Sequence, residues 1–131
     1  MTPKQTPVSE QDWAEIRRLL RLGRPIQQRS LAGLDASGRD LSGAVFNQCD
    51  LSGSRWEQAQ LEGATFVNCE LVGADFRCAG LRRVAFCQSQ MADTNWNGTV
   101  CWMLAFRPRD FNRSHWAAVS MEKSMFSSCR L

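Results

Sequence analysis

Apolar side chains, most of them large, recur at every fifth position of this chain. All twenty-one members of the series are apolar, although apolar residues make up only 44% of the chain. A period of five fits neither an α-helix, with about 3.6 residues per turn, nor a strand, with a repeat of about two. It predicts a chain that turns a corner every five residues and points one large side chain inward per unit. The series comprises Leu31, Ala36, Leu41, Phe46, Leu51, Trp56, Leu61, Phe66, Leu71, Phe76, Leu81, Phe86, Met91, Trp96, Cys101, Phe106, Phe111, Trp116, Met121, Phe126 and Leu131.

A second series of small residues lies two positions before the large ones. We expect these side chains to point inward as well, beside the large ones. Glycines recur at every tenth residue from Gly33 to Gly73, where a tight corner requires a positive φ angle. After Gly73 the same places hold Arg83 and Asp93, which predicts less regular corners in the second half. The small series comprises Ala44, Cys49, Ser54, Ala59, Ala64, Cys69, Ala74, Ala79, Val84, Ser89, Thr94 and Thr99.

Individual units resemble the pentapeptide-repeat consensus, which reads roughly Ala-Asp/Asn-Leu-x-x. The clearest are residues 40–44 (DLSGA) and 70–74 (ELVGA), and the match extends over about residues 31–131. The resemblance implies an all-β solenoid, a right-handed quadrilateral β-helix with four units per coil. About five coils at ~4.8 Å each give a rod on the order of 24 Å long.

A coil of twenty residues places residues twenty apart in stacked columns. One column then consists entirely of phenylalanine and the column opposite it of tryptophan and phenylalanine, while the other two are mainly aliphatic. Such an arrangement fills a narrow interior without voids. The four columns are Phe46, Phe66, Phe86, Phe106, Phe126; Trp56, Phe76, Trp96, Trp116; Leu41, Leu61, Leu81, Cys101, Met121; and Leu51, Leu71, Met91, Phe111, Leu131.

The chain before the repeats predicts an N-terminal α-helical cap. Residues 1–8 are expected to be a flexible tail, 9–24 a capping helix and 25–131 the pentapeptide-repeat β-helix. Ser9 with Asp12 is typical of a helix start, and Gly23 and Pro25 end the pattern. An apolar stripe at helical spacing is expected to cover the first coil. Its remaining surface carries the candidate interface arginines Arg17, Arg18 and Arg21, which alternatively dock an acidic partner.

The C-terminal end is the second candidate interface. Open solenoid ends expose apolar cross-section and unpaired backbone groups. The five-residue pattern also places apolar side chains outward there, and exposed apolar patches mark contacts. We therefore expect a homodimer through this end. The alternative is that the repeat loses register near Pro108 and some of these residues fold inward. The candidate residues are Val100, Trp102, Met103, Met125 and Leu131.

Composition and charge narrow the classes of partner. The net charge of +3 lies entirely within residues 1–30, because residues 31–131 hold ten basic and ten acidic side chains. A neutral body is expected neither to bind nucleic acid directly nor to imitate it. The chain has no apolar run of about 18 residues to enter a membrane and no secretory signal pattern. A bacterial, cytoplasmic protein is expected, with non-classical secretion left open by a similarity of residues 31–43 to secretion-associated pentapeptide modules.

The sequence offers no catalytic, cofactor or metal site. Its six cysteines form no CxxC pair, and His115 is the one histidine, so the short-spaced ligands of a zinc site are missing. His115 precedes an inward tryptophan and is expected to be a solvated surface residue. Cys49 and Cys69 stack in adjacent coils, where a disulfide is sterically conceivable but reduced thiols are favoured.

Two functions follow from the resemblance. The first is a non-enzymatic protein-interaction scaffold that binds a partner through its flat faces or its ends. The second is protection of DNA gyrase, as in quinolone-resistance pentapeptide proteins that imitate duplex DNA. Those relatives are longer and acidic and dimerise through their C-terminal ends. The neutral repeat body disfavours the second function, since duplex DNA carries about one charge per 1.7 Å.

Overall fold

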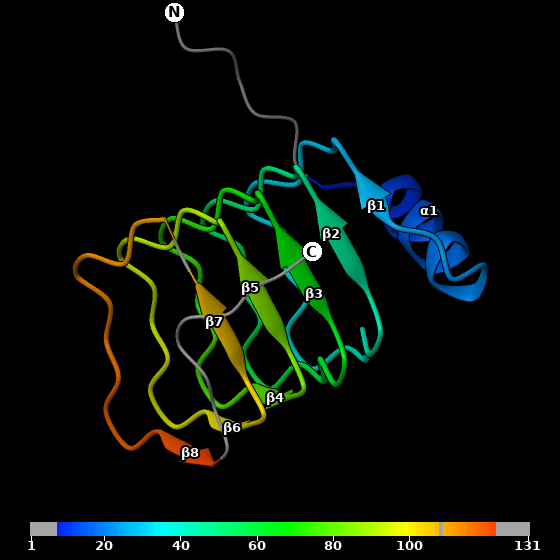
Figure 1. Ribbon diagram of the computed structural model, residues 1–131. Coiled ribbons are helices and arrows are strands. Elements are labelled where there is room, and N and C mark those ends of the chain that lie inside the picture. Colours follow the sequence, from blue (N-terminus) through cyan, green and yellow to red (C-terminus); the bar gives the residue numbers. More distant parts are fainter. Residues whose placement is uncertain (1–7, 108, 123–131) are drawn as a thin grey trace, which may run out of the picture.

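The chain winds into a four-sided β-solenoid whose coil takes twenty residues (Figure 1). The computed structural model describes residues 8–107 and 109–122. It has about five turns and one N-terminal helix, which confirms the predicted fold class. The expected tail and the chain from 123 onward lie outside the described residues, apart from Val8.

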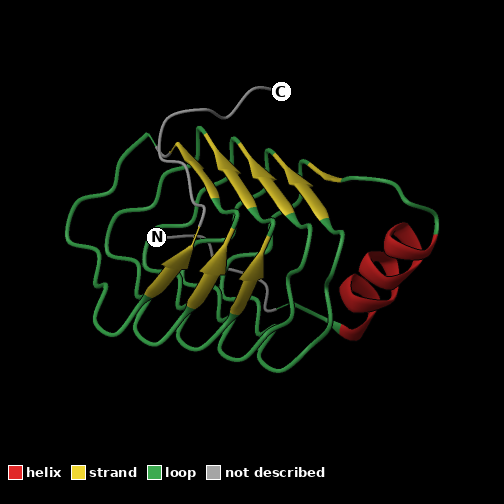
Figure 2. Cartoon of the chain, turned by 60° about the horizontal axis from the view of Figure 1, so that its bottom comes forward, coloured by secondary structure: helices red, strands yellow, loops and turns green. Residues whose placement is uncertain are grey.

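Five short parallel strands stack along one side of the solenoid, here called the five-strand side (Figure 2). Their register is strictly twenty residues: Phe46 pairs with Phe66, and Phe66 with Phe86. Parallel pairing over so short a repeat satisfies the backbone groups of each coil with those of its neighbours. The strands are β1 (Ile26–Gln27), β2 (Val45–Asn47), β3 (Thr65–Val67), β5 (Ala85–Cys87) and β7 (Ala105–Arg107).

A second side changes its backbone along the rod. In the first two coils it turns at Gly43 and Gly63, with Ala44 N–H donating to the Leu41 carbonyl at 3.1 Å. From Leu81 onward it is extended and forms a parallel sheet of three strands, so we call it the three-strand side. These strands are β4 (Gly80–Arg82), β6 (Val100–Trp102) and β8 (Ser120–Glu122).

The corner residue keeps a positive φ angle along the whole rod. Gly63 and Gly73 each have φ of 73°, and the residues twenty positions later, Arg83 and Asp93, have 57° and 59°. The expectation of less regular corners is therefore right for the three-strand side, where turns open into strands. It is wrong for the opposite side, where Asp93 retains the turn. A left-handed conformation costs a non-glycine residue about 1–2 kcal/mol. Pairing with the neighbouring coils holds these residues in that conformation.

Two aromatic columns fill the interior from opposite sides. Phe46 and Phe66 stack at 5.1 Å between ring centroids, and Phe76 and Trp96 at 4.5 Å. Rings from the two columns meet edge to face across the interior, as Phe46 and Trp56 do at 5.5 Å. Both arrangements are favourable for aromatic pairs. The side that carries Trp56 is called the Trp56 side below, and the remaining one the Leu51 side.

The small inward series is buried as predicted, and its hydroxyls serve the tryptophans. Trp56 Nε1 donates to Ser54 Oγ at 2.6 Å, and Trp96 Nε1 to Thr94 Oγ1 at 2.7 Å. An indole N–H buried without a partner would destabilise the fold by about 1–3 kcal/mol. A hydroxyl two residues before a tryptophan therefore supplies the acceptor that this core requires.

The repeat stays in register across position 108. β7 pairs Phe106 with Phe86, and beyond it Asp110 bridges to Gln90 and His115 to Asn95. Every one of these pairs is twenty residues apart. The alternative that the repeat loses register near Pro108 is thus wrong for the described residues on either side of it.

Helix α1 (Glu10–Arg21) covers the first coil. Ser9 caps it, since the Ser9 hydroxyl accepts from Asp12 N–H and the Asp12 carboxylate accepts from Ser9 N–H at 2.8 Å. Trp13, Ile16 and Leu19 face the solenoid and are buried. Helical spacing favours Leu20 for the apolar stripe, with Leu19 as a further candidate, whereas the structure buries Leu19 and leaves Leu20 half-buried.

Polar contacts fasten the helix to the first coil. The Arg39 guanidinium lies 3.8 Å from the centre of the Trp13 ring, a cation–π contact. Glu15 accepts hydrogen bonds from Arg18 at 3.0 Å and from Arg29, on the coil, at 3.2 Å. The hydrogen bond from Arg18 is the main cause that holds the pKa of Glu15 below its ordinary value.

Candidate functional site

The predicted interface residues of strand β6 point away from the core. Val100 is 58% exposed and Met103 45%, while Trp102 between them is half-buried. In a strand whose Cys101 faces inward, its neighbours must face outward. The other two candidates of this group, Met125 and Leu131, lie outside the described residues.

These side chains lie on the flank of the rod, and this corrects the expectation that they belong to its C-terminal end. β6 is covered along the axis by β8, which pairs Trp102 with Glu122. Outward side chains project perpendicular to the axis, so a residue one coil before the last described strand cannot contribute to the cross-section. The flank and the end are therefore two separate surfaces.

Two arginines surround Trp102, and the sequence analysis missed them. The guanidinium carbon of Arg82 lies 4.8 Å from the centre of the Trp102 ring, and that of Arg83 lies 5.5 Å away. Arg82 is the strand partner of Trp102, twenty residues earlier. Applying the twenty-residue spacing to outward positions, as well as inward ones, would have found this contact.

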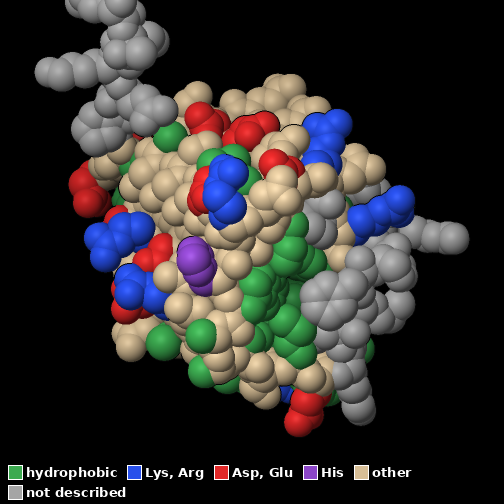
Figure 3. Space-filling view, turned by 90° about the vertical axis from the view of Figure 1, so that its left-hand side faces the viewer, with side chains coloured by type: hydrophobic (Ala, Val, Ile, Leu, Met, Phe, Trp, Pro, Cys, Tyr) green, Lys and Arg blue, Asp and Glu red, His purple; other side chains and the backbone are tan. Residues whose placement is uncertain are grey.

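The last described coil presents an apolar hollow. Its volume is about 500 Å³, and Figure 3, which looks onto this end, shows apolar side chains gathered there. Among the described residues no further coil stacks on these side chains, which leaves them half-buried. The five-residue series predicts Phe111, Trp116 and Met121 as core residues. The hollow is lined by Phe111, Trp116, Val119 and Met121.

The predicted arginines of helix α1 are exposed on its outer face. Arg17 and Arg21, with Ala14 and Leu20, line a shallow depression of about 440 Å³. Arg18 is engaged by Glu15. Two cationic side chains over a small apolar floor remain available at this end.

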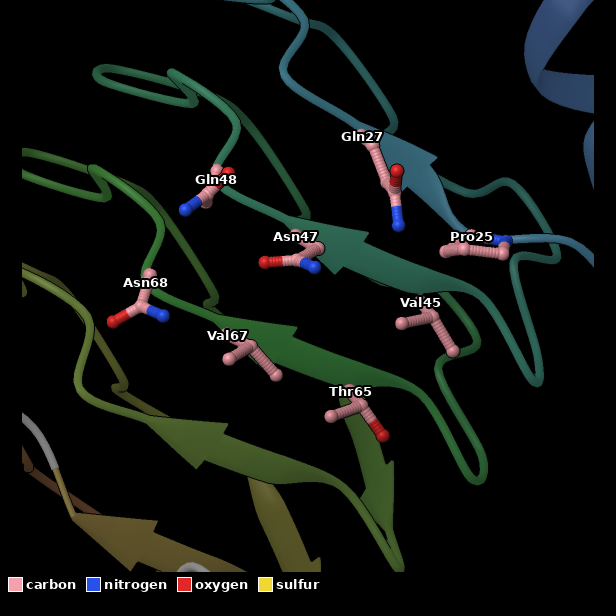
Figure 4. A pocket seen from close by; sticks show the side chains of 8 residues that line it. All are labelled: Pro25, Gln27, Val45, Asn47, Gln48, Thr65, Val67 and Asn68. Carbon is pink, nitrogen blue, oxygen red and sulfur yellow. The ribbon is translucent and has the colours of Figure 1, made fainter. Parts of the chain in front are cut away.

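A further depression lies on the five-strand side, over β1, β2 and β3 (Figure 4). Its volume is about 540 Å³, and amide side chains surround small apolar ones. Gln28 donates to Gln48 at 3.1 Å along the neighbouring corner. The lining residues are Pro25, Gln27, Val45, Asn47, Gln48, Thr65, Val67 and Asn68.

Cys49 and Cys69 are thiols buried in adjacent coils, as expected. Each thiol donates to a backbone carbonyl, Cys49 to Ile26 at 3.2 Å and Cys69 to Phe46 at 3.3 Å. Interaction with the neighbouring thiol lowers the pKa of Cys49 and, together with burial, raises that of Cys69. Both are inaccessible from solvent, which suits small core residues.

The described part of the chain contains no cluster of three or more side chains suited to hold a metal ion. His115 is exposed on the outer surface of the Trp56 side. Within the same residues, α1 is neither long nor apolar enough to cross a membrane. The cytoplasmic location stays a prediction.

The repeat geometry is matched by a known family. The family profile described as a pentapeptide repeat region matches residues 39–109, more than half of the chain. The chain belongs to the pentapeptide-repeat family. Pentapeptide-repeat proteins are generally structural or interaction proteins rather than enzymes. No curated protein matches the sequence.

Solved pentapeptide-repeat structures share the fold. QnrB1, a plasmid-mediated fluoroquinolone resistance protein, is 20% identical with a TM-score of 0.50, over 80% of this chain and 64% of QnrB1. The chain thus spans less than two thirds of the length of QnrB1. Rfr23 from the cyanobacterium Cyanothece 51142 is 14% identical with a TM-score of 0.45, over 88% of this chain and 99% of Rfr23. At 20% identity the similarity to QnrB1 concerns the fold alone.

Proposed function

We propose that this pentapeptide-repeat protein is a non-enzymatic scaffold that binds a protein partner through its outer surfaces. The observation that carries the proposal is that the interior is filled by side chains, whereas the outer surface exposes large apolar residues at a few positions. Stacked aromatic columns leave no room for a substrate between coils. Recognition therefore takes place on the outer surface. Of the four large apolar residues exposed in the described part, Val100 lies on β6 and Met103 directly follows it.

The rod is a stiff support for such surfaces. Each coil is hydrogen-bonded to the next on all four sides, as the Leu31, Ala36 and Leu41 N–H groups illustrate at 2.8 Å each. Side chains twenty residues apart are therefore held in fixed rows. Preorganised rows reduce the entropy lost on binding.

The hollow on the last described coil supports a homodimer. Phe111 and Trp116 are half-buried aromatic residues, the types that dominate protein interfaces. A second copy placed across a two-fold axis covers both hollows at once and closes the assembly. Helix α1 covers the opposite end, so the contact does not propagate into a fibre.

Gyrase protection is the less favoured function. Duplex DNA is a uniformly negative rod, whereas charges on the Trp56 side alternate, with Arg55 bridged between Asp35 and Asp75. Arg77 forms an ion pair with Asp75 at 2.7 Å in the same region. Paired charges of opposite sign cancel the field that a DNA mimic needs.

Sedimentation velocity at micromolar concentration tests the dimer. Ala118→Glu places a charge beside Trp116 and Val119, while Gln58→Glu changes the same corner sixty residues earlier, at φ of 59° against 56°. We expect a wild-type dimer, a monomeric Ala118→Glu variant and an unaffected control. A wild-type monomer, or a dimer in all three, removes the homodimer from the proposal.

A supercoiling assay with gyrase and a fluoroquinolone tests the rival function. We expect no protection of gyrase at protein concentrations that saturate the dimer. Protection that is retained by Ala118→Glu would instead support the less favoured function and overturn the scaffold as the main role.

A further inference from the structure

The outer face of the three-strand side carries a cluster that differs from the rest of the rod. We call it the arginine–tryptophan patch: Arg82, Arg83, Val100, Trp102 and Met103. Strand register places Arg82 directly beside Trp102 and Gly80 directly beside Val100. Tryptophan, arginine and methionine are the residue types enriched in protein interfaces, and tryptophan and arginine dominate their hot spots.

The two arginines of the patch keep their hydrogen-bonding edges open. Stacking on the Trp102 ring uses the flat face of a guanidinium and leaves its N–H groups in the plane available. Among the described residues, neither Arg82 nor Arg83 pairs with a carboxylate. Elsewhere on the rod, Arg77 and Arg113 are both bound by aspartates, at 2.7 Å in each case. The patch therefore presents two preoriented cations that lack an acidic partner within the described chain.

A small notch adjoins these cations. Its volume is about 200 Å³, and Gln60, Glu62, Gly80 and Arg82 lie around it. Gly80 alone of the nine glycines lies outside the positive-φ region, so its backbone does not require glycine. The nearest atom to a Cβ built there is the Ala59 carbonyl oxygen, 3.8 Å away. Neither conformation nor crowding accounts for this glycine, and the missing side chain leaves room for atoms of a ligand.

We propose that the arginine–tryptophan patch binds an acidic, partly apolar segment of a partner protein. This inference rests on the scaffold function proposed above and names the chemistry of its partner. Carboxylates of the segment accept hydrogen bonds from Arg82 and Arg83, and charge-assisted bonds of this kind are the strong ones. An apolar side chain of the segment covers Val100 and Met103, and a neighbouring one enters the notch at Gly80.

The surroundings of the patch favour a protein segment over a nucleic acid. Glu62 flanks Arg82 in the notch, and Glu122 is paired beside Trp102 on β8. A continuous polyanion would be repelled by both carboxylates. Isolated carboxylates spaced by apolar residues avoid them and also use the exposed surface of Val100 and Met103.

Fluorescence anisotropy with the full chain tests this proposal. The probe is a labelled peptide, Gly-Ser-Leu-Glu-Val-Glu-Leu-Ser, compared with the same peptide carrying glutamine, and with one carrying lysine, at both glutamate positions. We expect the acidic peptide to bind about tenfold or more tightly than the glutamine peptide, because two charge-assisted bonds distinguish them. Binding should weaken as salt is raised. A labelled DNA duplex serves as the polyanion and is expected to bind less tightly than the acidic peptide.

Protein variants locate the binding. Arg82→Gln with Arg83→Gln, and separately Gly80→Val, should each weaken the acidic peptide about tenfold or more. The matched pair Arg77→Gln with Arg113→Gln, whose charges are already bound by aspartates, should leave it unchanged. Unfolding midpoints of all variants confirm that they remain folded. Equal binding of the acidic and glutamine peptides, undiminished binding by the Arg82/Arg83 variant, or tighter binding of the duplex would overturn the proposal. The dimer measured by sedimentation does not involve Arg82, Arg83 or Gly80. If the peptide experiments fail, the scaffold proposal can therefore still be tested separately.

Discussion

The N-terminal and C-terminal halves of the solenoid are built from the same five-residue unit but present different surfaces. The first coil is closed by helix α1, which buries Trp13, Ile16 and Leu19 against it. On two sides of the first half, glycines such as Gly43 and Gly53 form the corners. In the second half, side chains replace the corner glycines on two sides, and the last described coil leaves Phe111 and Trp116 half-buried.

This difference shows how a repeat protein separates stability from recognition. Solenoid stability is roughly a sum of coil and nearest-neighbour terms, so an inner coil gains two interfaces and a terminal coil one. Helix α1 supplies the missing interface at the N-terminal end. At the other described end, the same deficit leaves apolar surface that a partner can bury.

The largest expected effect is the loss of an inner aromatic ring. Phe86 is stacked on Phe66 at 4.9 Å and meets Trp96 at 5.2 Å. Phe86→Ala should lower the free energy of unfolding by about 3–5 kcal/mol, measured by urea denaturation. Exposed Gln88→Ala should change it by less than about 0.5 kcal/mol. Trp116→Ala, in the last described coil, should fall between the two, and equality with Phe86→Ala would remove the distinction between inner and terminal coils.

A smaller effect is expected at the N-terminal cap. Ile16 lies on the buried face of α1 and is 2% exposed. Ile16→Ala should therefore lower the free energy of unfolding by about 2–4 kcal/mol. Arg17→Ala, on the outer face of the same helix, is the control and should be nearly neutral. Deleting residues 1–24 should in addition reduce solubility more than deleting 1–8. If both deletions behave alike, the helix is a docking arm and not a cap.

The corners allow a finer comparison. Gly53 has φ of 64° and open space around a built Cβ, so Gly53→Ala introduces conformational strain without a clash. We expect a loss of about 1 kcal/mol in the free energy of unfolding. Gln58 already adopts φ of 59° with a side chain, so Gln58→Ala should have almost no effect. Equal losses at both positions would show that the strain does not depend on the corner residue.

The smallest expected effect on stability concerns Asp93 and Arg113, two charged residues at corners where the first half has glycine. Arg113 donates to Asp93 at 2.7 Å, and this hydrogen bond lowers the pKa of Asp93 below its ordinary value. A lowered pKa in the folded state stabilises the protein above the unfolded pKa of about 3.9. That contribution is lost as the pH falls through the folded pKa. The free energy of unfolding at pH 7 should therefore be higher for the wild type than for Asp93→Asn. The difference between the two free energies should become smaller as the pH is lowered. A constant difference would mean that ionisation of Asp93 plays no part.

The inward pattern was readable from the sequence because every fifth side chain from Leu31 to Phe106 is buried. The columns from Phe46 to Phe86 and from Trp56 to Trp116 are stacked as expected. Phe106 continues the first column but meets Phe86 edge to face at 5.7 Å. The length of the coil came from the family resemblance, since spacing alone does not say how many units close a turn. The strand register now provides it directly.

The outer surfaces were less predictable, for physical reasons. Outward side chains are not constrained by packing, so Arg82 and Trp102 carry no periodic signal of their own. Their contact depends on which residues the coil length makes neighbours. Separating the flank from the C-terminal end likewise required knowing that β8 follows β6 along the axis. The dimer and the partner remain predictions.

Site-specific photocross-linking in the source cells can show whether the interaction surfaces lie in the C-terminal half of the solenoid. A photoreactive amino acid at Val100 is compared with one at Asp40, an exposed outward position in the same row sixty residues earlier. The two sites share the same side of the rod and differ only in the half to which they belong. We predict a discrete protein adduct at Val100 that disappears with Arg82→Gln and Arg83→Gln, and none at Asp40. Equal adducts at both sites, or an adduct at Asp40 alone, would contradict the account.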